Sequence, residues 1–140
     1  MNRSVRNERG SVSIWLALTA FVMITLLGLT IDLSGQVGAL QRDHDLAAQA
    51  ARTGAQQLQA SPAIEGTGAL INPGPATLAA QRYLAAAGLT GTVTATTDTL
   101  TVTVTDHYST RFLGLIGITH LPVTTTATAQ LIRTLGGTPR

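Results

Sequence analysis

Three histidines and seven acidic residues supply whatever acid–base or metal chemistry this chain has. The only local cluster of them is Asp43-His44-Asp45. The surrounding pattern predicts a helix, in which successive side chains point about 100° apart, so these three cannot converge on one metal ion. We expect a solvated patch of a helix, with His44 at its edge.

Other candidates for chemistry are weaker. His107 and His120 each lie beside an expected strand end, but nothing in their spacing requires them to meet, and Ser109 near His107 does not by itself indicate a nucleophile and base. The sequence has no G-x-S-x-G, no H-E-x-x-H and no Gly-rich phosphate loop after a strand. With no cysteine, thiolate zinc sites, disulfides and thiol nucleophiles are excluded. We expect a protein that is not an enzyme and holds no cofactor or metal.

The net positive charge of the chain comes from its first ten residues. Residues 1–10 carry three arginines and one glutamate, whereas the remainder carries six arginines and six acids and is neutral. Nucleic-acid binding needs clustered cations and usually stacking aromatics. Five aromatic residues spread over the chain supply neither, so we expect no nucleic-acid partner.

The longest uncharged stretch is the feature that most constrains function. Val12 to Ile31 is twenty residues without a charge, and a helix of that length is roughly 30 Å long, the thickness of a bilayer's hydrocarbon core. Arg3, Arg6 and Arg9 precede it and Asp32 follows it. The positive-inside rule therefore predicts a cytoplasmic N-terminus, with everything past Asp32 outside.

A cleaved secretory signal is the alternative to a permanent anchor. The apolar run is longer than the usual ~7–15 residues of the apolar core of a signal sequence, and the best small-residue cleavage site, 37–39, lies beyond Asp32. Both observations favour the anchor. For Asp32 itself we consider two roles, a marker of depth at the lipid headgroups and an ion-pair partner for another subunit.

Beyond Asp32 the pattern becomes that of an amphipathic helix reaching about Gln59. Its small apolar seam has two readings, an ordinary face that covers a sheet or a packing surface for other copies or partner helices. The seam consists of Val37, Leu40, His44, Ala47, Ala51, Gly54 and Leu58.

The rest of the sequence predicts a small α+β domain. A loop at 60–75 rich in Pro and Gly precedes a helix from Pro75 that stops at Gly88. Three antiparallel strands follow, at 91–97, 100–106 and 121–131, with a tight turn at Asp98-Thr99 and an apolar connection at 107–118. The expected organisation is a cytoplasmic basic stub (1–11), a transmembrane helix (12–31), an extracytoplasmic continuation helix (32–59), an α+β domain (60–135) and a disordered tail (136–140).

Several of these motifs together resemble the TadE/TadG-like family, small membrane proteins linked to assembly of Flp-type (type IVb) pili. The match covers about residues 9–60: Arg9-Gly10-Ser11, a hydrophobic helix, an exit at Gly28-Leu29-Thr30-Ile31-Asp32, and an Ala/Gln/Arg-rich helix. The resemblance implies a single-pass protein of the bacterial cytoplasmic membrane. Its implied partners are other pilus or secretion-system proteins and further copies of itself.

One departure from the family pattern concerns processing. Pilin-like members of the family are cut after the junction glycine and carry Glu five residues later, where this chain has Trp15. We therefore expect cleavage between Gly10 and Ser11 to be absent or inefficient. The expected function is a structural or assembly component of such a machine; the alternative is a small secreted binding domain released by signal cleavage.

Overall fold

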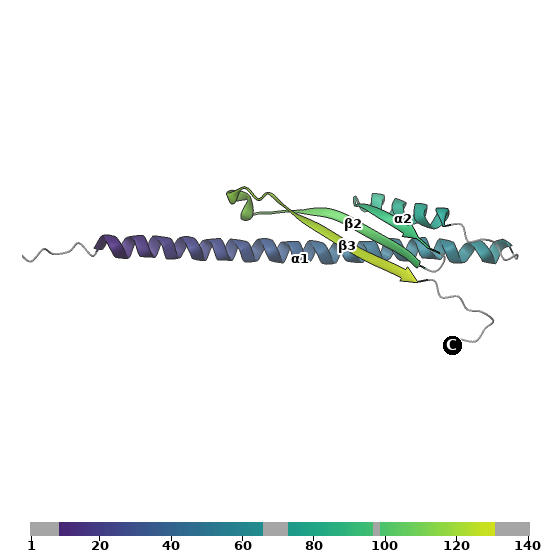
Figure 1. The fold of residues 1–140 in the computed structure, drawn as a ribbon, viewed down its shortest axis with the longest axis horizontal. Coiled ribbons are helices and arrows are strands. Elements are labelled where there is room, and N and C mark those ends of the chain that lie inside the picture. Colours follow the sequence, from purple (N-terminus) through teal and green to yellow (C-terminus); the bar gives the residue numbers. More distant parts are fainter. Residues whose placement is uncertain (1–8, 66–72, 97–98, 131–140) are drawn as a thin grey trace, which may run out of the picture.

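The computed structural model describes residues 9–65, 73–96 and 99–130, with side chains of the first range described over 12–57. The elements are helix α1 (Arg9–Glu65), helix α2 (Gly74–Ala86), strands β1 (Thr90–Ala95) and β2 (Thr99–Ser109), a 3-10 turn η1 (Leu113–Ile116) and strand β3 (His120–Gln130). Figure 1 shows α2 and the sheet lying alongside the distal part of α1. The expected α+β fold is confirmed.

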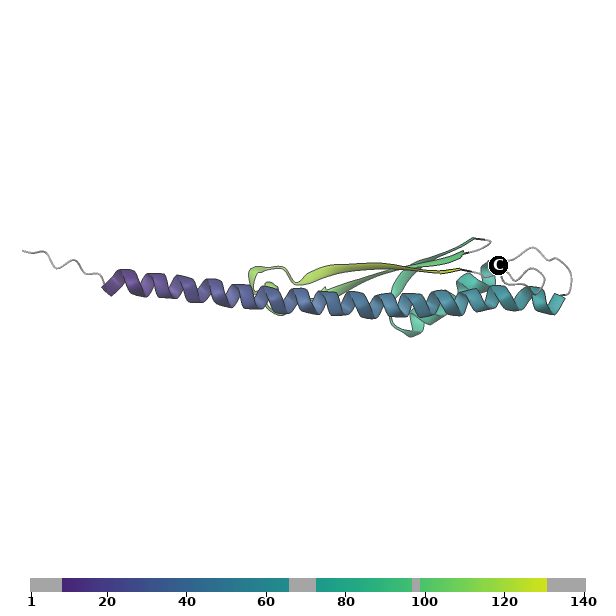
Figure 2. The same ribbon diagram turned by 90° about the horizontal axis from the view of Figure 1, so that it is seen from below.

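Helix α1 is one unbroken element of 57 residues, roughly 85 Å long. It continues straight from the apolar segment into the domain, as Figures 1 and 2 both show. Thr19, Thr25 and Thr30 donate their hydroxyls to carbonyls one turn back at 2.9 Å, which makes these polar side chains tolerable in an apolar medium.

The predicted end of this helix near Gln59 was wrong, and so was the predicted loop over residues 60–65. Residues 66–72 of that loop lie outside the described part of the chain. The helix continues through Pro62 to Glu65. Proline removes one backbone donor at a cost of about 3 kcal/mol, so it disfavours a helix without always ending it. Helix α2, by contrast, begins and ends close to the expected positions, and Gly88 follows it with a positive φ of 73°.

The sheet is an antiparallel meander in the order β1-β2-β3. As predicted, Leu100, Val102 and Val104 form its buried side. Thr99 was expected in the turn but already belongs to β2, and its carbonyl accepts the Thr96 amide at 2.8 Å. Asp98, the other predicted turn residue, lies outside the described residues. Strand β2 also runs three residues past Asp106, to Ser109, so the β2–β3 hairpin is longer than predicted.

Threonines occupy the outer side of this sheet in rows that cross all three strands. The register aligns Thr90 with Thr105 and Thr124, Thr92 with Thr103 and Thr126, and Thr94 with Thr101 and Thr128. Two of these cross-strand pairs join hydroxyls at 3.1–3.2 Å. Threonine suits a pleated surface that faces water, and this side of the sheet was expected to do so.

Both helices pack on the inner side of the sheet, α1 mainly against β2 and β3 and α2 against β1. Small residues dominate the contact, which allows the helix backbones to approach closely. The buried hydrophobic cluster consists of Ala47, Ala50, Ala51, Ala76, Ala80, Leu84, Leu89, Leu100, Val102, Val104 and Ala127.

Candidate functional site

The apolar segment of α1 is uncovered by the rest of the fold. Over its most apolar 18 residues the mean hydropathy is 2.3, and only 6% of that stretch is buried against the rest of the protein. The core helix of a soluble protein would be mostly buried, whereas here large apolar side chains are exposed on every side of the helix. By length and composition this helix can cross a membrane, and a signal sequence near an N-terminus would pass the same test.

Asp32, at the end of that segment, is completely buried. Its carboxylate accepts three consecutive backbone amides at the start of η1, from Arg111 at 2.7 Å, Phe112 at 2.9 Å and Leu113 at 2.6 Å. The free amides at the start of a helical turn are a natural site for an anion. Asp32 thus joins α1 to a segment about eighty residues later in the chain.

The electrostatics of this contact favour the charged carboxylate. Burial alone would raise the pKa of Asp32, but the amides of Leu113, Arg111 and Phe112, with the charge of Arg111, lower it below its ordinary value. Neither role expected for Asp32 includes this one. A depth marker would face the headgroups and an ion pair would need a second subunit, whereas this carboxylate is satisfied within its own chain.

Two glycines on α1 make room for the same hairpin end. A Cβ atom at Gly28 would lie 2.7 Å from the Phe112 Cβ, and one at Gly35 would overlap the Tyr108 ring. One turn of spacing between Gly28, Asp32 and Gly35 places all three on one side of the helix. That spacing is the sequence signal that would have identified a docking face here.

Gln36 extends the docking face by one more contact, donating to the Pro122 carbonyl at 3.1 Å. The hairpin end is therefore held to α1 by polar contacts at Asp32 and Gln36 and by close packing at the two glycines.

The structure describes only part of the region that was used to predict the membrane topology and the processing site. Arg3 and Arg6 lie outside the described residues, and Arg9, Gly10 and Ser11 are helical but their side chains are not described. The structure therefore leaves the predicted orientation and processing as predictions.

The predicted seam of α1 divides into two parts. Ala47, Ala51 and Gly54 are buried in the chain's own core, as the sheet-covering reading expected. Val37 and Leu40 do not join that core: they are 53% and 40% exposed. The side chain of Leu58 lies outside the described part of the chain.

Asp43 departs from the expected solvated patch, because its side chain is completely buried. It lies eleven residues after Asp32, close to three full turns, so both acids share the inner face of α1. One Asp43 oxygen accepts from Arg42 at 3.0 Å, and Arg42 also reaches Asp106 at 3.3 Å. The other oxygen, Oδ2, is buried without a hydrogen-bond partner.

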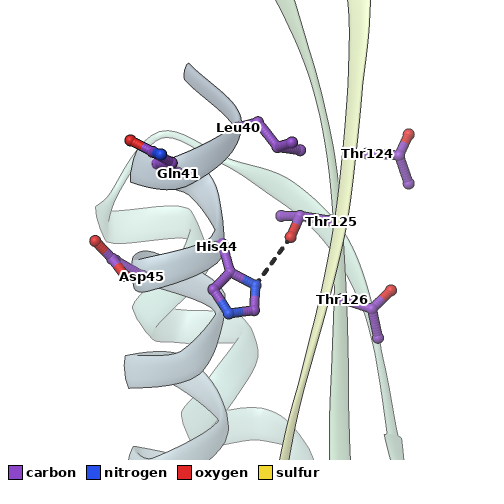
Figure 3. A pocket seen from close by; sticks show the side chains of 7 residues that line it. All are labelled: Leu40, Gln41, His44, Asp45, Thr124, Thr125 and Thr126. Atoms are coloured by element: carbon purple, nitrogen blue, oxygen red, sulfur yellow. Dashed lines mark hydrogen bonds between the residues drawn. The ribbon is translucent and has the colours of Figure 1, made fainter. Parts of the chain in front are cut away.

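His44 lies beside an open hollow between α1 and β3, shown in Figure 3. Its Nδ1 is 3.1 Å from the Thr125 hydroxyl, and Gln41 and Asp45 lie on the far side of the helix from β3. The hollow therefore brings one imidazole against one hydroxyl, and Asp45 is the acidic residue in its lining. It is lined by Leu40, Gln41, His44, Asp45, Thr124, Thr125 and Thr126.

The remaining candidates do not form a constellation. In the register of β2 and β3, His107 lies opposite Pro122 and His120 opposite Ser109, and His120 bonds the neighbouring Thr119 hydroxyl at 2.9 Å. Among the residues that the structure describes, no group of three or more histidines and acids could hold a metal ion.

Comparison of the chain with protein-family models, with curated proteins and with solved structures finds no match.

Proposed function

We propose that this chain is a membrane-anchored structural or assembly component of a Tad (Flp, type IVb-like) pilus or a related secretion machine, acting through protein contacts. The observation that carries the proposal is the continuity of α1, whose uncovered apolar segment leads without a break into the part of the helix that belongs to the domain core. The likeness to TadE/TadG-like sequences over residues 9–60 supplies the choice of machine.

Contacts near Asp32 argue against release by signal cleavage. A cut at the small-residue site, after Ala39, would remove Asp32, Gly35 and Gln36 from the domain. The amides of Arg111, Phe112 and Leu113 would then lose their acceptor. A domain that uses residues of the apolar helix in its own packing is better suited to keeping that helix.

Orientation follows the charge flanks, with the N-terminus in the cytoplasm and the domain outside. In this arrangement the exposed side chains of Val37 and Leu40 lie on the first turns beyond the membrane, Leu40 in the lining of the hollow beside β3, where other single-helix proteins would be neighbours. These two side chains are the most direct places to look for partners.

Deletion and complementation in the native cell tests the assembly role. Loss of the protein should abolish surface filaments or export by the associated machine, and the wild-type chain should restore them. A photo-crosslinking residue at Val37 or Leu40 should capture membrane components, whereas one at buried Ala47 should not. Unchanged filaments and export after deletion, or recovery of the protein from the medium starting near Leu40, would overturn the proposal.

A further inference from the structure

The β2–β3 connection, residues 110–119, carries an apolar tip that the fold leaves uncovered. We call this segment the η1 loop. Leu115 is 84% exposed and Ile116 is 66% exposed, and Phe112 and Ile118 are exposed as well. Arg111 is the only charged residue in the segment. An exposed cluster of this kind marks a site of contact with a protein or a membrane.

The position of the η1 loop favours contact with a membrane over contact with a protein. Figures 1 and 2 show it at the end of the sheet that lies nearest the apolar part of α1. Phe112 packs directly over Gly28, which lies four residues, about 6 Å along the helix axis, on the apolar side of Asp32. Elements that lie in a membrane interface bury their apolar side by about 5–10 Å. The loop is therefore continuous with the surface that α1 offers to lipid.

Most backbone amides of the η1 loop donate hydrogen bonds within the chain, as a medium with little water requires. Backbone amides in lipid must be satisfied internally. The amides of Arg111, Phe112 and Leu113 donate to Asp32, and those of Leu115, Gly117 and Ile118 donate to carbonyls within the loop at 3.0–3.2 Å. The Thr110 amide closes the base of the loop on the Thr119 carbonyl at 3.0 Å.

From these observations we infer that the η1 loop inserts Leu115 and Ile116 into the outer leaflet of the bilayer that α1 crosses. The chain then contacts the membrane at two places, and Asp32 holds them together. Arg111, at the start of the loop, is placed to meet lipid phosphate. This inference rests on the anchoring part of the proposed function and is independent of the choice of machine.

Single-cysteine labelling tests the insertion, because the 140 residues of the chain include no cysteine. The chain is reconstituted in phosphatidylcholine–phosphatidylglycerol vesicles with an environment-sensitive fluorophore at Leu115→Cys or Ile116→Cys. Val22→Cys in the apolar segment is the lipid control, and exposed Leu78→Cys on α2 is the water control. Labels at 115 and 116 should emit at shorter wavelength than the label at 78. They should also be quenched by nitroxide lipids and resist iodide several-fold better.

The controls separate failure of the inference from failure of the anchor. Iodide access at 115 and 116 equal to that at 78, with the label at 22 still quenched by lipid, would overturn the inserted loop alone. Protection from iodide without lipid quenching would also overturn it, in favour of a protein contact between copies. Iodide access at 22 would overturn the anchor and the inserted loop together.

Discussion

Replacing Gly54 by alanine tests how closely α1 and α2 pack. A Cβ atom at this position would lie 2.7 Å from the Ala76 carbonyl oxygen and 3.2 Å from the Ala80 Cβ, and would overlap the end of the Leu100 side chain. All three neighbours are fully buried, so none can move into solvent to make room. Overpacking of this kind costs about 1–3 kcal/mol, whereas alanine in place of glycine stabilises a helix by about 1 kcal/mol.

Gly38→Ala is the matched control on the same helix. A Cβ atom there meets nothing within 4 Å, so only the gain in helix propensity applies. Subtracting one variant from the other cancels that gain and isolates the overpacking. We expect Gly54→Ala to have a free energy of unfolding about 1–3 kcal/mol below that of Gly38→Ala. For a domain of this size each kcal/mol corresponds to about 4–8 °C in melting temperature.

The assay is urea unfolding of the whole chain in a mild detergent, monitored by far-UV circular dichroism. The detergent-bound apolar segment adds the same signal to every variant, so differences report the domain. If Gly54→Ala is as stable as Gly38→Ala, the close approach of the two helices is refuted. The sheet-covering reading of this part of the seam would then lose its support.

Three further outcomes are expected. Because the pKa of folded Asp32 is lowered, its contribution to stability is present above the ordinary carboxyl pKa and is lost as pH falls through the folded value. The free energy of unfolding in urea between pH 3 and 6 should therefore depend less on pH in Asp32→Asn than in wild type. Equal pH dependence in the two proteins would contradict the Asp32 contacts. A reporter active only outside the cytoplasm should work when fused at Arg140 and fail when fused ahead of Arg3, and the reverse would overturn the orientation. Co-expression with a prepilin peptidase followed by N-terminal sequencing should find the Gly10–Ser11 bond largely intact because Trp15 stands where pilins carry Glu; efficient cleavage would instead place the chain among minor pilins.

Local pattern was sufficient to predict most elements of the fold. Alternation of Val and Thr identifies β2 and its buried side, and Pro75 and Gly88 bracket α2 closely. The end of α1 was missed, because the Pro- and Gly-rich stretch 60–75 was interpreted as one loop. The length of β2 was missed because Tyr108 and Ser109 continue the strand beyond its clear alternation, into residues that pair with Leu121 and His120.

The spacing of Gly28, Asp32 and Gly35 marks one side of α1, but the segment that Asp32 contacts could not be predicted from such patterns. An acid after an apolar helix reads as a boundary, and the sequence around Arg111 gives no sign that its amides lack partners. Their meeting depends on the length of the β2–β3 hairpin, which brings residues eighty positions apart together. Asp43 was misplaced for a related reason: charge alone suggested solvent, while the turn count from Asp32 placed it inside.

The absence of a joint within α1, over residues 9–65, has a mechanical consequence. The 34 residues from Asp32 to Glu65 form a rod of roughly 50 Å, and the sheet and α2 pack along it. In a membrane, any tilt or rotation of the apolar segment 12–31 would move the whole domain by the same angle. A pull on the far end of the domain would likewise be felt within the bilayer.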